Sequence, residues 1–313
     1  MAQPKTFADM IKSGPMIVAP GAYDCITARV IEQAGFPCVY MTGAGTSAAH
    51  GLPDYGLLTM TEMVANARRI TSCINVPLVS DSDTGYGNEL NAYRTVQEFE
   101  RAGVSAIHIE DQVFPKKCGH LENKELIPAE DYFAKIRAAA AAKRSQDFQI
   151  IARTDSRAVA GFEEAIFRAN GALAAGADMV FVEAPQTLEE VASVPKLVKG
   201  PCLLNMVLNG KTPLPVLEDA ETMGYRISIL PGMLLSNIIG LCDKLLAEVK
   251  ETGQVPGTFS GGGPAKTFAR FGAAEWDERR TAFRGDAAPA VKAAAKATAV
   301  KPKKASPKRE AAE

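Results

Sequence analysis

The chain alternates between short apolar runs and longer amphipathic segments. The apolar runs are four or five residues long, and nearly all are rich in β-branched or large apolar side chains. Continuous apolar runs of this length are typical of strands that are buried on both faces of a parallel sheet. The pattern predicts eight strands: Met16–Ala19, Cys38–Met41, Pro77–Asp81, Ala106–Glu110, Gln149–Arg153, Met179–Glu183, Cys202–Asn205 and Arg226–Leu230.

The amphipathic segments carry apolar residues at helical spacing, which indicates helices with one buried face. Three of them close on an Ala-Gly pair, at Gly35, Gly103 and Gly176, and the chain then passes directly into a predicted strand. Glycine is the residue preferred just beyond a helix C-terminus. The predicted helices are Ile26–Ala34, Glu62–Ile70, Ala92–Ala102, Ala129–Ala140, Glu163–Ala175, Leu188–Val198 and Leu214–Met223.

Eight strands that alternate with helices are typical of a (β/α)8 TIM barrel, a fold of the α/β class. A length of 313 residues fits, because such barrels use about 200–250 residues or more in one domain. A doubly wound sheet is the alternative, but the G-x-G-x-x-G phosphate fingerprint does not follow the first predicted strand. We therefore assign residues 1–285 to a barrel domain.

The composition is that of a globular protein, with 47% hydrophobic and 23% charged residues. The sequence contains no apolar run of about 18 residues, and its N-terminus does not resemble a signal peptide, so we expect a cytoplasmic protein without a membrane partner. The six cysteines lack CxxC spacing, which disfavours a zinc site and indicates a reducing compartment. They are Cys25, Cys38, Cys73, Cys118, Cys202 and Cys242.

The C-terminal residues 286–313 differ in composition from the rest of the chain. Residues 287–313 contain six lysines, one arginine and two glutamates, a net charge of +5, so the preceding residues carry −6 of the chain's net −1. This segment is rich in alanine, lysine and proline and has no aromatic residue, which predicts a disordered tail. The lysines suggest nucleic acid as an alternative partner, but the body of the chain offers no matching basic stretch, so we expect none.

Polar residues stand at the end of nearly every predicted strand, and a barrel places its chemistry at that end. Carboxylates that converge there repel one another unless a cation or raised pKa values relieve the repulsion. Oxygen ligands select Mg2+, or Mn2+, over zinc. We expect Asp81 to bind the ion directly and Asp83 and Glu110 to bind directly or through water; the alternative for Asp83 is a cap on the Gly85–Gly87 turn. The strand-end residues are Thr42–Thr46, Asp81–Asp83, Glu110, Asp111, Arg153–Asp155, Glu183 and Asn205.

The segment after the fourth predicted strand contains a cysteine between lysines and a histidine, Lys116-Lys117-Cys118-Gly119-His120. Nearby positive charge and exposure lower the pKa of a thiol. We therefore predict that Cys118 transfers a proton near neutral pH. The other five cysteines lie in or beside apolar runs and are expected to pack in the core. His120 is either a residue that orders the loop or a donor to the substrate.

These residues lie in motifs that resemble those of the isocitrate lyase and phosphoenolpyruvate mutase superfamily, over residues 5–285. The resemblance implies a (β/α)8 barrel whose last helix is exchanged between subunits, a Mg2+ cofactor and a homotetramer. The matching motifs are Gly51-Leu52-Pro53-Asp54, Asp81-Ser82-Asp83-Thr84-Gly85-Tyr86-Gly87, Ile109-Glu110-Asp111-Gln112, Lys116-Lys117-Cys118-Gly119-His120 and Ala152-Arg153-Thr154-Asp155.

The resemblance also implies a role for individual residues. Asp81 would hold Mg2+, Asp83 and Glu110 would bind it through water, and Asp54 would support the outer shell. The carboxylate of a 2-oxo or 2-hydroxy acid would lie against Tyr40, Thr42, Gly43 and Ala44. Arg153 would pair with a substrate oxygen, and Glu183 and Asn205 would complete the pocket. The segment Lys116–His120, which includes Gly119, would form a mobile gating loop.

Within the superfamily, the Cys-Gly-His element is a feature of C–C lyases and is missing from phosphonate-forming members. The short chain resembles 2-methylisocitrate and 2,3-dimethylmalate lyases, which implies retro-Claisen cleavage of a 2-hydroxy di- or tricarboxylate to pyruvate and a carboxylic acid. Tyr40 would act as the base and Cys118 as the acid, with Lys116 and His120 beside them. The alternatives are oxaloacetate decarboxylation, a phosphonate-forming mutase and a barrel that only binds or stores a ligand.

Two departures from the superfamily pattern affect the expected substrate. Thr42-Gly43-Ala44-Gly45 replaces Ser-Gly-Gly-Gly and adds a methyl group where the backbone approaches the substrate. The segment from Leu230 to Ser236 carries no cation, whereas 2-methylisocitrate lyases have an arginine there. A tricarboxylate would lose a charge-assisted partner worth about 1.5–3 kcal/mol. We therefore expect a smaller or more apolar 2-substituted malate.

Overall fold

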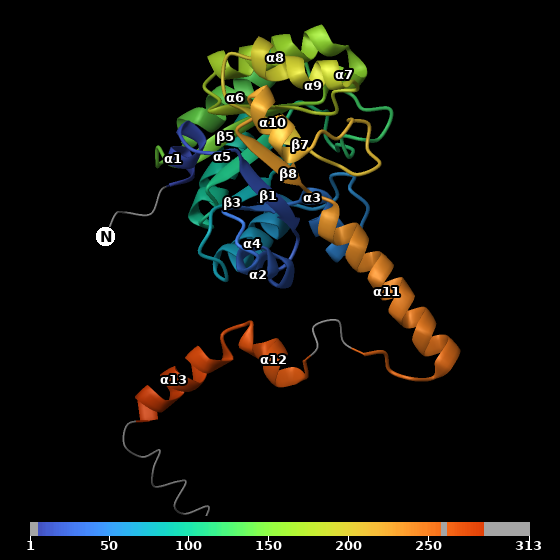
Figure 1. Ribbon diagram of the computed structural model, residues 1–313. Coiled ribbons are helices and arrows are strands. Elements are labelled where there is room, and N and C mark those ends of the chain that lie inside the picture. Colours follow the sequence, from blue (N-terminus) through green and yellow to red (C-terminus); the bar gives the residue numbers. More distant parts are fainter. Residues whose placement is uncertain (1–5, 258–261, 285–313) are drawn as a thin grey trace, which may run out of the picture. The chain divides into compact units, whose positions relative to one another are not determined.

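The computed structural model describes residues 6–257 and 262–284 (Figure 1). Contacts divide the chain into two compact units, Met1–Ala247 and Glu248–Glu313. The first unit contains the whole barrel. The second contains α12 (Pro264–Ala269) and α13 (Ala273–Arg284), and α11 (Met233–Thr252) runs across the division. The predicted basic tail at residues 286–313 lies outside the described residues.

Eight parallel strands close into a barrel in the order in which they occur along the chain. Each strand pairs with the next, and Ile17 of the first strand pairs with Ile227 of the last to close the ring. The predicted (β/α)8 fold is confirmed, and the doubly wound alternative is wrong. The strands are β1 (Ile17–Ala22), β2 (Val39–Met41), β3 (Leu78–Asp81), β4 (Ala106–Glu110), β5 (Gln149–Thr154), β6 (Met179–Val182), β7 (Cys202–Asn205) and β8 (Ile227–Leu230).

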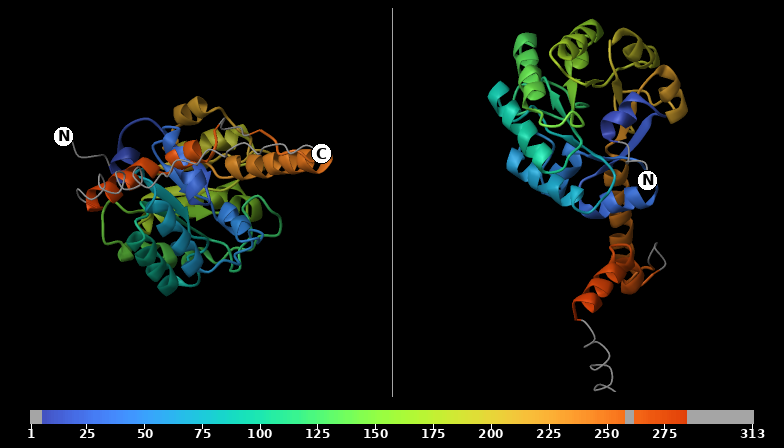
Figure 2. Two further views of the ribbon diagram at one scale, coloured as in Figure 1. Left: turned by 90° about the horizontal axis from the view of Figure 1, so that it is seen from below. Right: turned by 90° about the vertical axis from the view of Figure 1, so that its left-hand side faces the viewer.

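Helices surround the strands, as the two views of Figure 2 show. Each of the seven predicted helices has a counterpart, and Gly35, Gly103 and Gly176 all have positive φ, as a glycine beyond a helix C-terminus requires. The helices of the first unit before α11 are α1 (Phe7–Lys12), α2 (Cys25–Gln33), α3 (Gly43–Ala49), α4 (Met60–Thr71), α5 (Glu89–Arg101), α6 (Ala129–Ala142), α7 (Ser156–Val159), α8 (Phe162–Ala174), α9 (Leu188–Leu197) and α10 (Leu217–Met223).

The glycine-rich segment that follows β2 is helical. It begins α3, with the Thr42 hydroxyl accepting the Gly45 N–H at 3.2 Å as an N-cap. The helix forms here because its first residues are small enough to pack against β3. A Cβ on Gly43 would stand 2.4 Å from Oδ2 of Asp81. The backbone of α3 therefore lies directly on the carboxylate that was predicted to hold the metal ion.

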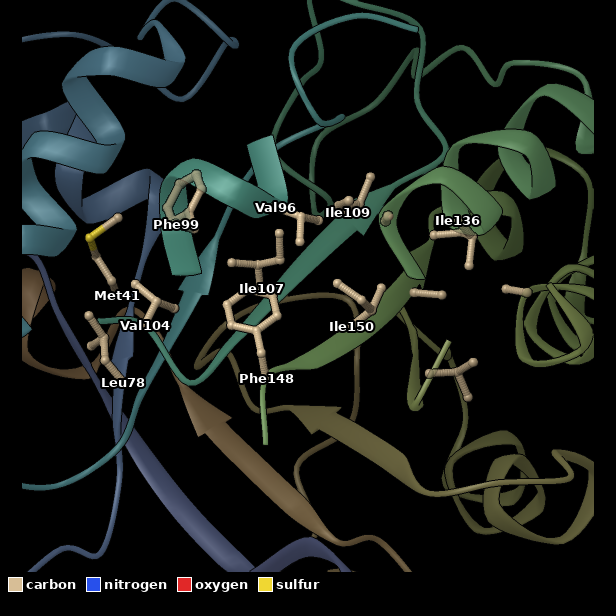
Figure 3. Close-up of a cluster of buried hydrophobic side chains, with 14 of the residues drawn as sticks. Met41, Leu78, Val96, Phe99, Val104, Ile107, Ile109, Ile136, Phe148 and Ile150 are labelled. Atoms are coloured by element: carbon tan, nitrogen blue, oxygen red, sulfur yellow. The ribbon is translucent and has the colours of Figure 1, made fainter. Parts of the chain in front are cut away.

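The apolar core has two layers, and the alternation of side chains along each strand divides them. On β4, Ile107 and Ile109 point outward and pack with Val96 and Phe99 of α5 (Figure 3). Ala106 points inward, into a second cluster that fills the barrel. Because successive side chains alternate, His108 and Glu110 share the inward face with Ala106. Burial of both faces explains why the strands read as continuous apolar runs.

The cysteines divide by position. Cys38 and Cys202 are buried as predicted, Cys25 and Cys73 are partly exposed, and Cys242 is exposed on α11. The prediction that Cys242 packs in the core is wrong for the single chain, because no residue of α11 is buried. All six thiols are unpaired. Within the ranges that the structure describes, no helix combines the length and apolar character needed to cross a membrane.

Candidate active site

A cavity of about 130 Å3 lies at the C-terminal ends of the strands and brings together side chains from all parts of the barrel sequence. Most of the residues predicted to form the site line it, and Lys116, Asp83, Glu110 and Gly43 contact residues of this lining. The lining residues are Tyr40, Thr42, Ala44, Asp54, Asp81, Cys118, Gly119, His120, Arg153, Glu183, Asn205, Val207, Pro231, Gly232 and Leu235.

Three buried carboxylates occupy the side of this site formed by β3 and β4. The Asp83 backbone N–H donates to Oδ1 of Asp81 at 2.9 Å, and the Glu110 N–H donates to the Asp83 carbonyl at 3.0 Å. Asp83 has φ 47°, a left-handed conformation that is rare for a residue with a side chain. Strain of this kind persists where the surrounding structure holds it, and it is frequent at functional sites.

The electrostatics of the three carboxylates differ. Burial raises the pKa of Asp81, but His108, Lys116 and Arg153 outweigh it and hold that pKa at about 2. Burial raises the pKa of Asp83 to about 6 and that of Glu110 well above its usual range. Asp81 is thus the carboxylate that is most firmly ionised by its surroundings.

The three carboxylates are suited to a cation that keeps part of its water shell, and not to an ion whose ligands all come from protein side chains. Within residues 6–257 and 262–284, no group of three or more histidine, cysteine, aspartate or glutamate side chains can hold a metal ion. Mg2+ does not need one, because it keeps several waters and uses one or two carboxylates. Neither oxygen of the buried Glu110 accepts a hydrogen bond from the described residues, although Nη1 of Arg153 lies 3.1 Å from Oε2. Buried oxygens without donors are suited to accept hydrogen bonds from the water shell of an ion.

Lys116 compensates part of this negative charge. Its Nζ lies 2.6 Å from Oδ1 of Asp54 and 2.9 Å from Oδ1 of Asp83, and its side chain is only 1% exposed. Burial lowers the pKa of Lys116, but Asp83, Glu110 and Asp81 raise it well above 10.5. The alternative prediction for Asp83 was a cap on the Gly85–Gly87 turn. In the structure the Asp83 carboxylate pairs with Lys116 instead.

Arg153, which pairs with Glu110 across the neighbouring strands β5 and β4, is held in place at the cavity. Its Nε donates to Oδ2 of Asp155 at 2.9 Å, and its guanidinium lies 5.2 Å from the ring centre of Phe181. Burial lowers the pKa of Arg153, but Asp155, Glu110 and Glu183 raise it well above 12.5. The guanidinium is therefore a fixed positive charge beside the cavity, suited to a substrate carboxylate.

The prediction that Cys118 is an exposed thiol with a lowered pKa is wrong. Burial, followed by the charge of Asp54, raises the pKa of Cys118 to about 11. The Cys118 N–H donates to the Asp54 carbonyl at 3.1 Å, so the loop lies over the cavity, and the nearby Lys116 is already neutralised by two carboxylates. The thiol therefore stays protonated at neutral pH, the state that a proton donor needs.

The loop that carries Cys118 is bound by Lys124 and packs closely against Arg153 and Glu183. The Lys124 ammonium is buried and donates to Oδ1 of Asp155 at 2.8 Å and to the Gly119 carbonyl. A Cβ on Gly119 would stand 2.5 Å from Nη2 of Arg153 and 2.6 Å from Cγ of Glu183. The close approach of this backbone to the cavity therefore requires glycine.

Sequence reasoning missed His108 and Lys124. The Nε2 of His108 lies 2.8 Å from the Tyr40 hydroxyl, and its Nδ1 lies 3.7 Å from Oδ1 of Asp81. Burial lowers the pKa of His108 to about 4, and burial followed by Asp81 raises that of Tyr40 well above 10. Alternation along the predicted strand 106–110 would have placed His108 inside the barrel with Glu110. Lys124 left no comparable signal, because its partner Asp155 is far away in the sequence.

Four residues beyond β7 and β8 form an apolar wall of the cavity: Val207, Pro231, Gly232 and Leu235. None of these four carries a charge. The sequence-based expectation that this side offers no cation to a distal carboxylate is consistent with their positions.

Comparison with known proteins places this geometry in a family. Residues 7–250 match the family described as phosphoenolpyruvate phosphomutase. The chain is 48% identical over 224 residues to 2,3-dimethylmalate lyase from Eubacterium barkeri, covering 71% of this chain and 78% of that protein. It is 43% identical over 245 residues to 2-methylisocitrate lyase from Aeropyrum pernix, covering 78% of this chain and 79% of that protein.

Solved structures agree. Oxaloacetate acetylhydrolase in complex with 3,3-difluorooxalacetate superposes with a TM-score of 0.86 at 36% identity, covering 90% of this chain and 97% of the other. Phosphonopyruvate hydrolase in complex with oxalate and Mg2+ superposes with a TM-score of 0.75 at 30% identity, covering 87% and 94%. The chain is a member of the phosphoenolpyruvate mutase and isocitrate lyase superfamily.

Proposed function

We propose that this protein is a Mg2+-dependent carbon–carbon lyase that cleaves a 2-hydroxy di- or tricarboxylate, of the 2-alkylmalate or 2-methylisocitrate type, to pyruvate and a carboxylic acid. The observation that carries the proposal is the partly exposed Cys118 thiol, which has a raised pKa and lines a cavity that also presents Arg153 and Asp81. A thiol in this state can protonate a carbanion-like leaving group, whereas a thiolate could not. The similarity to lyases that act on such acids supports the same chemistry.

The metal site is part of the proposal. Asp81 would bind Mg2+ directly, Asp83 and Glu110 would bind it through water, and Asp54 would act on it through Lys116; Mn2+ could replace it. The partnerless buried oxygens of Glu110 and the Mg2+ reported with phosphonopyruvate hydrolase support this assignment. When bound, the ion supplies a Lewis acid that lowers the pKa of the substrate's 2-hydroxyl group.

The side chains of the chain have separate tasks in the cleavage. Thr42, Gly43 and Ala44, at the start of α3, bind the carboxylate next to the 2-hydroxyl carbon, and Arg153 pairs with a substrate oxygen. Tyr40 takes the hydroxyl proton while its own phenolic proton passes to Nε2 of His108, 2.8 Å away, as the C2–C3 bond breaks and C2 becomes the carbonyl of pyruvate. The bonding electrons pass to C3, and the Cys118 thiol gives C3 its proton. The 116–120 loop keeps water out of the cavity during these steps.

The substrate class follows from the apolar wall. Val207, Pro231 and Leu235 favour an alkyl substituent over a third carboxylate, since a buried carboxylate without a partner is costly. The test is a product screen with Mg2+ over 2,3-dimethylmalate, citramalate, 2-methylisocitrate, isocitrate and oxaloacetate. Pyruvate plus a carboxylic acid from a 2-alkylmalate is expected. Glyoxylate as the main product would contradict the proposal.

Oxaloacetate is the second candidate substrate, and the similarity to oxaloacetate acetylhydrolase favours keeping it in the screen. Pyruvate plus CO2 would identify a decarboxylase, and oxalate plus acetate a hydrolase. Decarboxylation leaves an enolate that does not strictly need a thiol acid. A Cys118→Ser variant that still forms pyruvate from oxaloacetate would therefore favour oxaloacetate decarboxylation.

A phosphonate-forming mutase is the third alternative, and phosphoenolpyruvate in the same screen tests it.

We also propose a cytoplasmic homotetramer that forms by exchange of α11 between subunits. The six unpaired thiols support a reducing compartment. Ile239, Leu241 and Leu246 of α11 are exposed apolar residues, which supports burial against another subunit. Light scattering coupled to gel filtration should give four times the 33.3 kDa mass of one chain. A monomer at micromolar concentration would exclude the exchange.

A further inference from the structure

One buried lysine close to the cavity takes no part in the steps of the proposed cleavage. Lys124 lies in the connection between β4 and α6, and its side chain is only 1% exposed. Its Nζ donates to the Gly119 carbonyl and to Oδ1 of Asp155 at 2.8 Å. The main chain beside it is bound to the segment that leaves β4, because the Val113 N–H donates to the Glu125 carbonyl at 2.8 Å. Lys124 therefore stands where the connection returns to the barrel and reaches back to its middle.

Asp155 joins this lysine to Arg153. Oδ2 of Asp155 accepts from Nε of Arg153 at 2.9 Å, and Oδ1 accepts from Nη2 at 3.2 Å. Oδ1 also accepts from the Lys124 ammonium, so one carboxylate holds two cations. Burial raises the pKa of Asp155, but Arg153 and Lys124 outweigh it and hold that pKa well below its usual range. The carboxylate is therefore a fixed anion between the ammonium and the guanidinium.

The same lysine also sets the position of the loop. Gly119 directly follows Cys118, and a Cβ on Gly119 would stand 2.5 Å from Nη2 of Arg153. The backbone at Gly119 thus lies close to the guanidinium and is bound to the ammonium at its carbonyl oxygen. A lysine that only neutralised Asp155 would not need this second bond, because Arg153 already pairs with both oxygens of that carboxylate. The bond to Gly119 indicates a role in the loop that carries the thiol.

We propose that Lys124 is a positioning residue that holds the thiol of Cys118 in register with Arg153. It does so through its bonds to the Gly119 carbonyl and the Asp155 carboxylate. The inference rests on the proposed function, because that function makes Cys118 the proton donor and Arg153 a partner of the substrate. Misplacement of a reacting group by about 1 Å can cost about 100-fold in rate. Loss of the ammonium should therefore displace the thiol, while Arg153 keeps its bonds to Asp155.

The first test measures the exposure of Cys118 without any substrate. Burial is the largest cause that raises its pKa from 9.0 to about 11, and a displaced loop relieves that burial. In the full-length protein at pH 8, Lys124→Met should therefore speed the alkylation of Cys118 by iodoacetamide about 10- to 100-fold, as measured by mass spectrometry. Cys242, an exposed thiol on α11, supplies the internal reference in the same sample. A Cys118 rate equal to that of the unaltered protein would overturn the proposal.

The second test uses kinetics to separate Lys124 from a group that only binds substrate. With a 2-alkylmalate, Lys124→Met should lower kcat about 10- to 100-fold and change KM by less than about threefold. KM is largely kept because Arg153 remains held by Asp155 and can still pair with the substrate. A raised KM with an unchanged kcat would overturn the proposal. The alkylation test needs no turnover, so failure of this inference is distinct from failure of the lyase activity, which the product screen measures.

A second background keeps the test decisive if Lys124→Met alone does not fold. Asp155→Asn removes the buried negative charge, so Lys124→Met in that background leaves no unpaired carboxylate. Cys118 should be alkylated faster in this double variant than in Asp155→Asn alone, because the Gly119 carbonyl has lost its donor. Equal rates in the two proteins would overturn the proposal.

Lys143→Met is the matched control for the loss of an ion-paired lysine. The Nζ of Lys143 lies 2.7 Å from Oδ2 of Asp178, and the two side chains are 11% and 25% exposed. Asp178 directly precedes β6, so this pair lies at the end of the barrel where the strands begin, away from the cavity. The variant should lose stability but keep kcat and the Cys118 alkylation rate. Equally fast alkylation of Cys118 in Lys143→Met and Lys124→Met would mean that lost stability exposes the thiol, and would overturn the proposal.

Discussion

The Nζ of Lys116 lies 2.9 Å from Oδ1 of Asp83, and the two side chains are only 1% and 5% exposed. A second carboxylate, Asp54, approaches the same ammonium at 2.6 Å. Lys116, two residues before Cys118, is therefore paired with acidic partners from the segment after β3 and from the α3–α4 connection. Its charge stabilises those carboxylates more than it activates the thiol.

Replacement of Lys116 by methionine should leave Asp83 and Asp54 as buried charges without their cation. Removal of one partner from a buried ion pair costs about 3–5 kcal/mol. We expect Lys116→Met to lower the free energy of unfolding by this amount, measured from urea unfolding midpoints at unchanged m-value. The matched control is Lys117→Met, which removes an exposed hydrogen bond from the ammonium to the Asn123 carbonyl and should change stability by less than about 0.5 kcal/mol. Equal stabilities of the two variants would show that the ion pair is unimportant.

Cys118→Ser should reduce cleavage of a 2-alkylmalate at least about 100-fold, because a serine hydroxyl is a far weaker acid than the thiol that protonates C3. Mg2+ affinity, measured by titration calorimetry, should be unchanged, since Cys118 is not expected to contact the ion. Cys242→Ser, which changes an exposed thiol outside the site, is the control. Normal turnover by Cys118→Ser would remove the thiol from the mechanism.

The reactivity of Cys118 toward iodoacetamide should follow its raised pKa. Burial and Asp54 raise that pKa from 9.0 to about 11, so the thiolate fraction at pH 8 is about 100-fold smaller than for an ordinary thiol. The rate of Cys118 alkylation, followed by mass spectrometry, should keep rising with pH toward 11 instead of levelling near 9. The urea-unfolded chain provides the reference profile. Fast labelling of the folded protein at pH 7 would argue against a protonated thiol.

Gly119→Ala should displace the loop, because the added Cβ would stand 2.5 Å from Nη2 of Arg153. We expect kcat/KM to fall at least about tenfold, since misplacement of a reacting group by about 1 Å can cost about 100-fold. Gly257→Ala, where the Cβ meets nothing within 4 Å, is the control. Thermal unfolding of both variants shows whether the barrel is intact. Full activity of Gly119→Ala would mean that the loop can lie elsewhere during turnover.

Removal of divalent ions should abolish activity, and Mg2+ or Mn2+ should restore it. Glu110→Gln should weaken Mg2+ binding about 10- to 100-fold, the range for loss of a residue that orients a metal-bound water. Calorimetry measures this independently of turnover. Glu98→Gln, a change on the outer surface of α5, should bind as the unaltered protein does. Full activity in the presence of EDTA would contradict the proposed metal site.

The barrel could be predicted because its signals are local. Burial of both strand faces gives runs such as 106–110, and the turn from helix to strand needs positive φ at Gly35, Gly103 and Gly176. Parallel strands place their C-terminal ends at one rim, so the polar residues that follow each run had to come together. Asp81, Arg153 and Glu183 were therefore predicted as neighbours without knowledge of any distance.

The protonation states of these residues could not be predicted in the same way. The pKa of Cys118 depends on how deeply its loop is buried and on Asp54, and Lys116 is paired with a carboxylate 62 positions away. The backbone N–H that donates to Nδ1 of His120 is 91 positions away. Periodicity and composition specify which face of an element is buried. Desolvation and charge coupling depend on distances between separate elements, and those distances exist only in the folded chain.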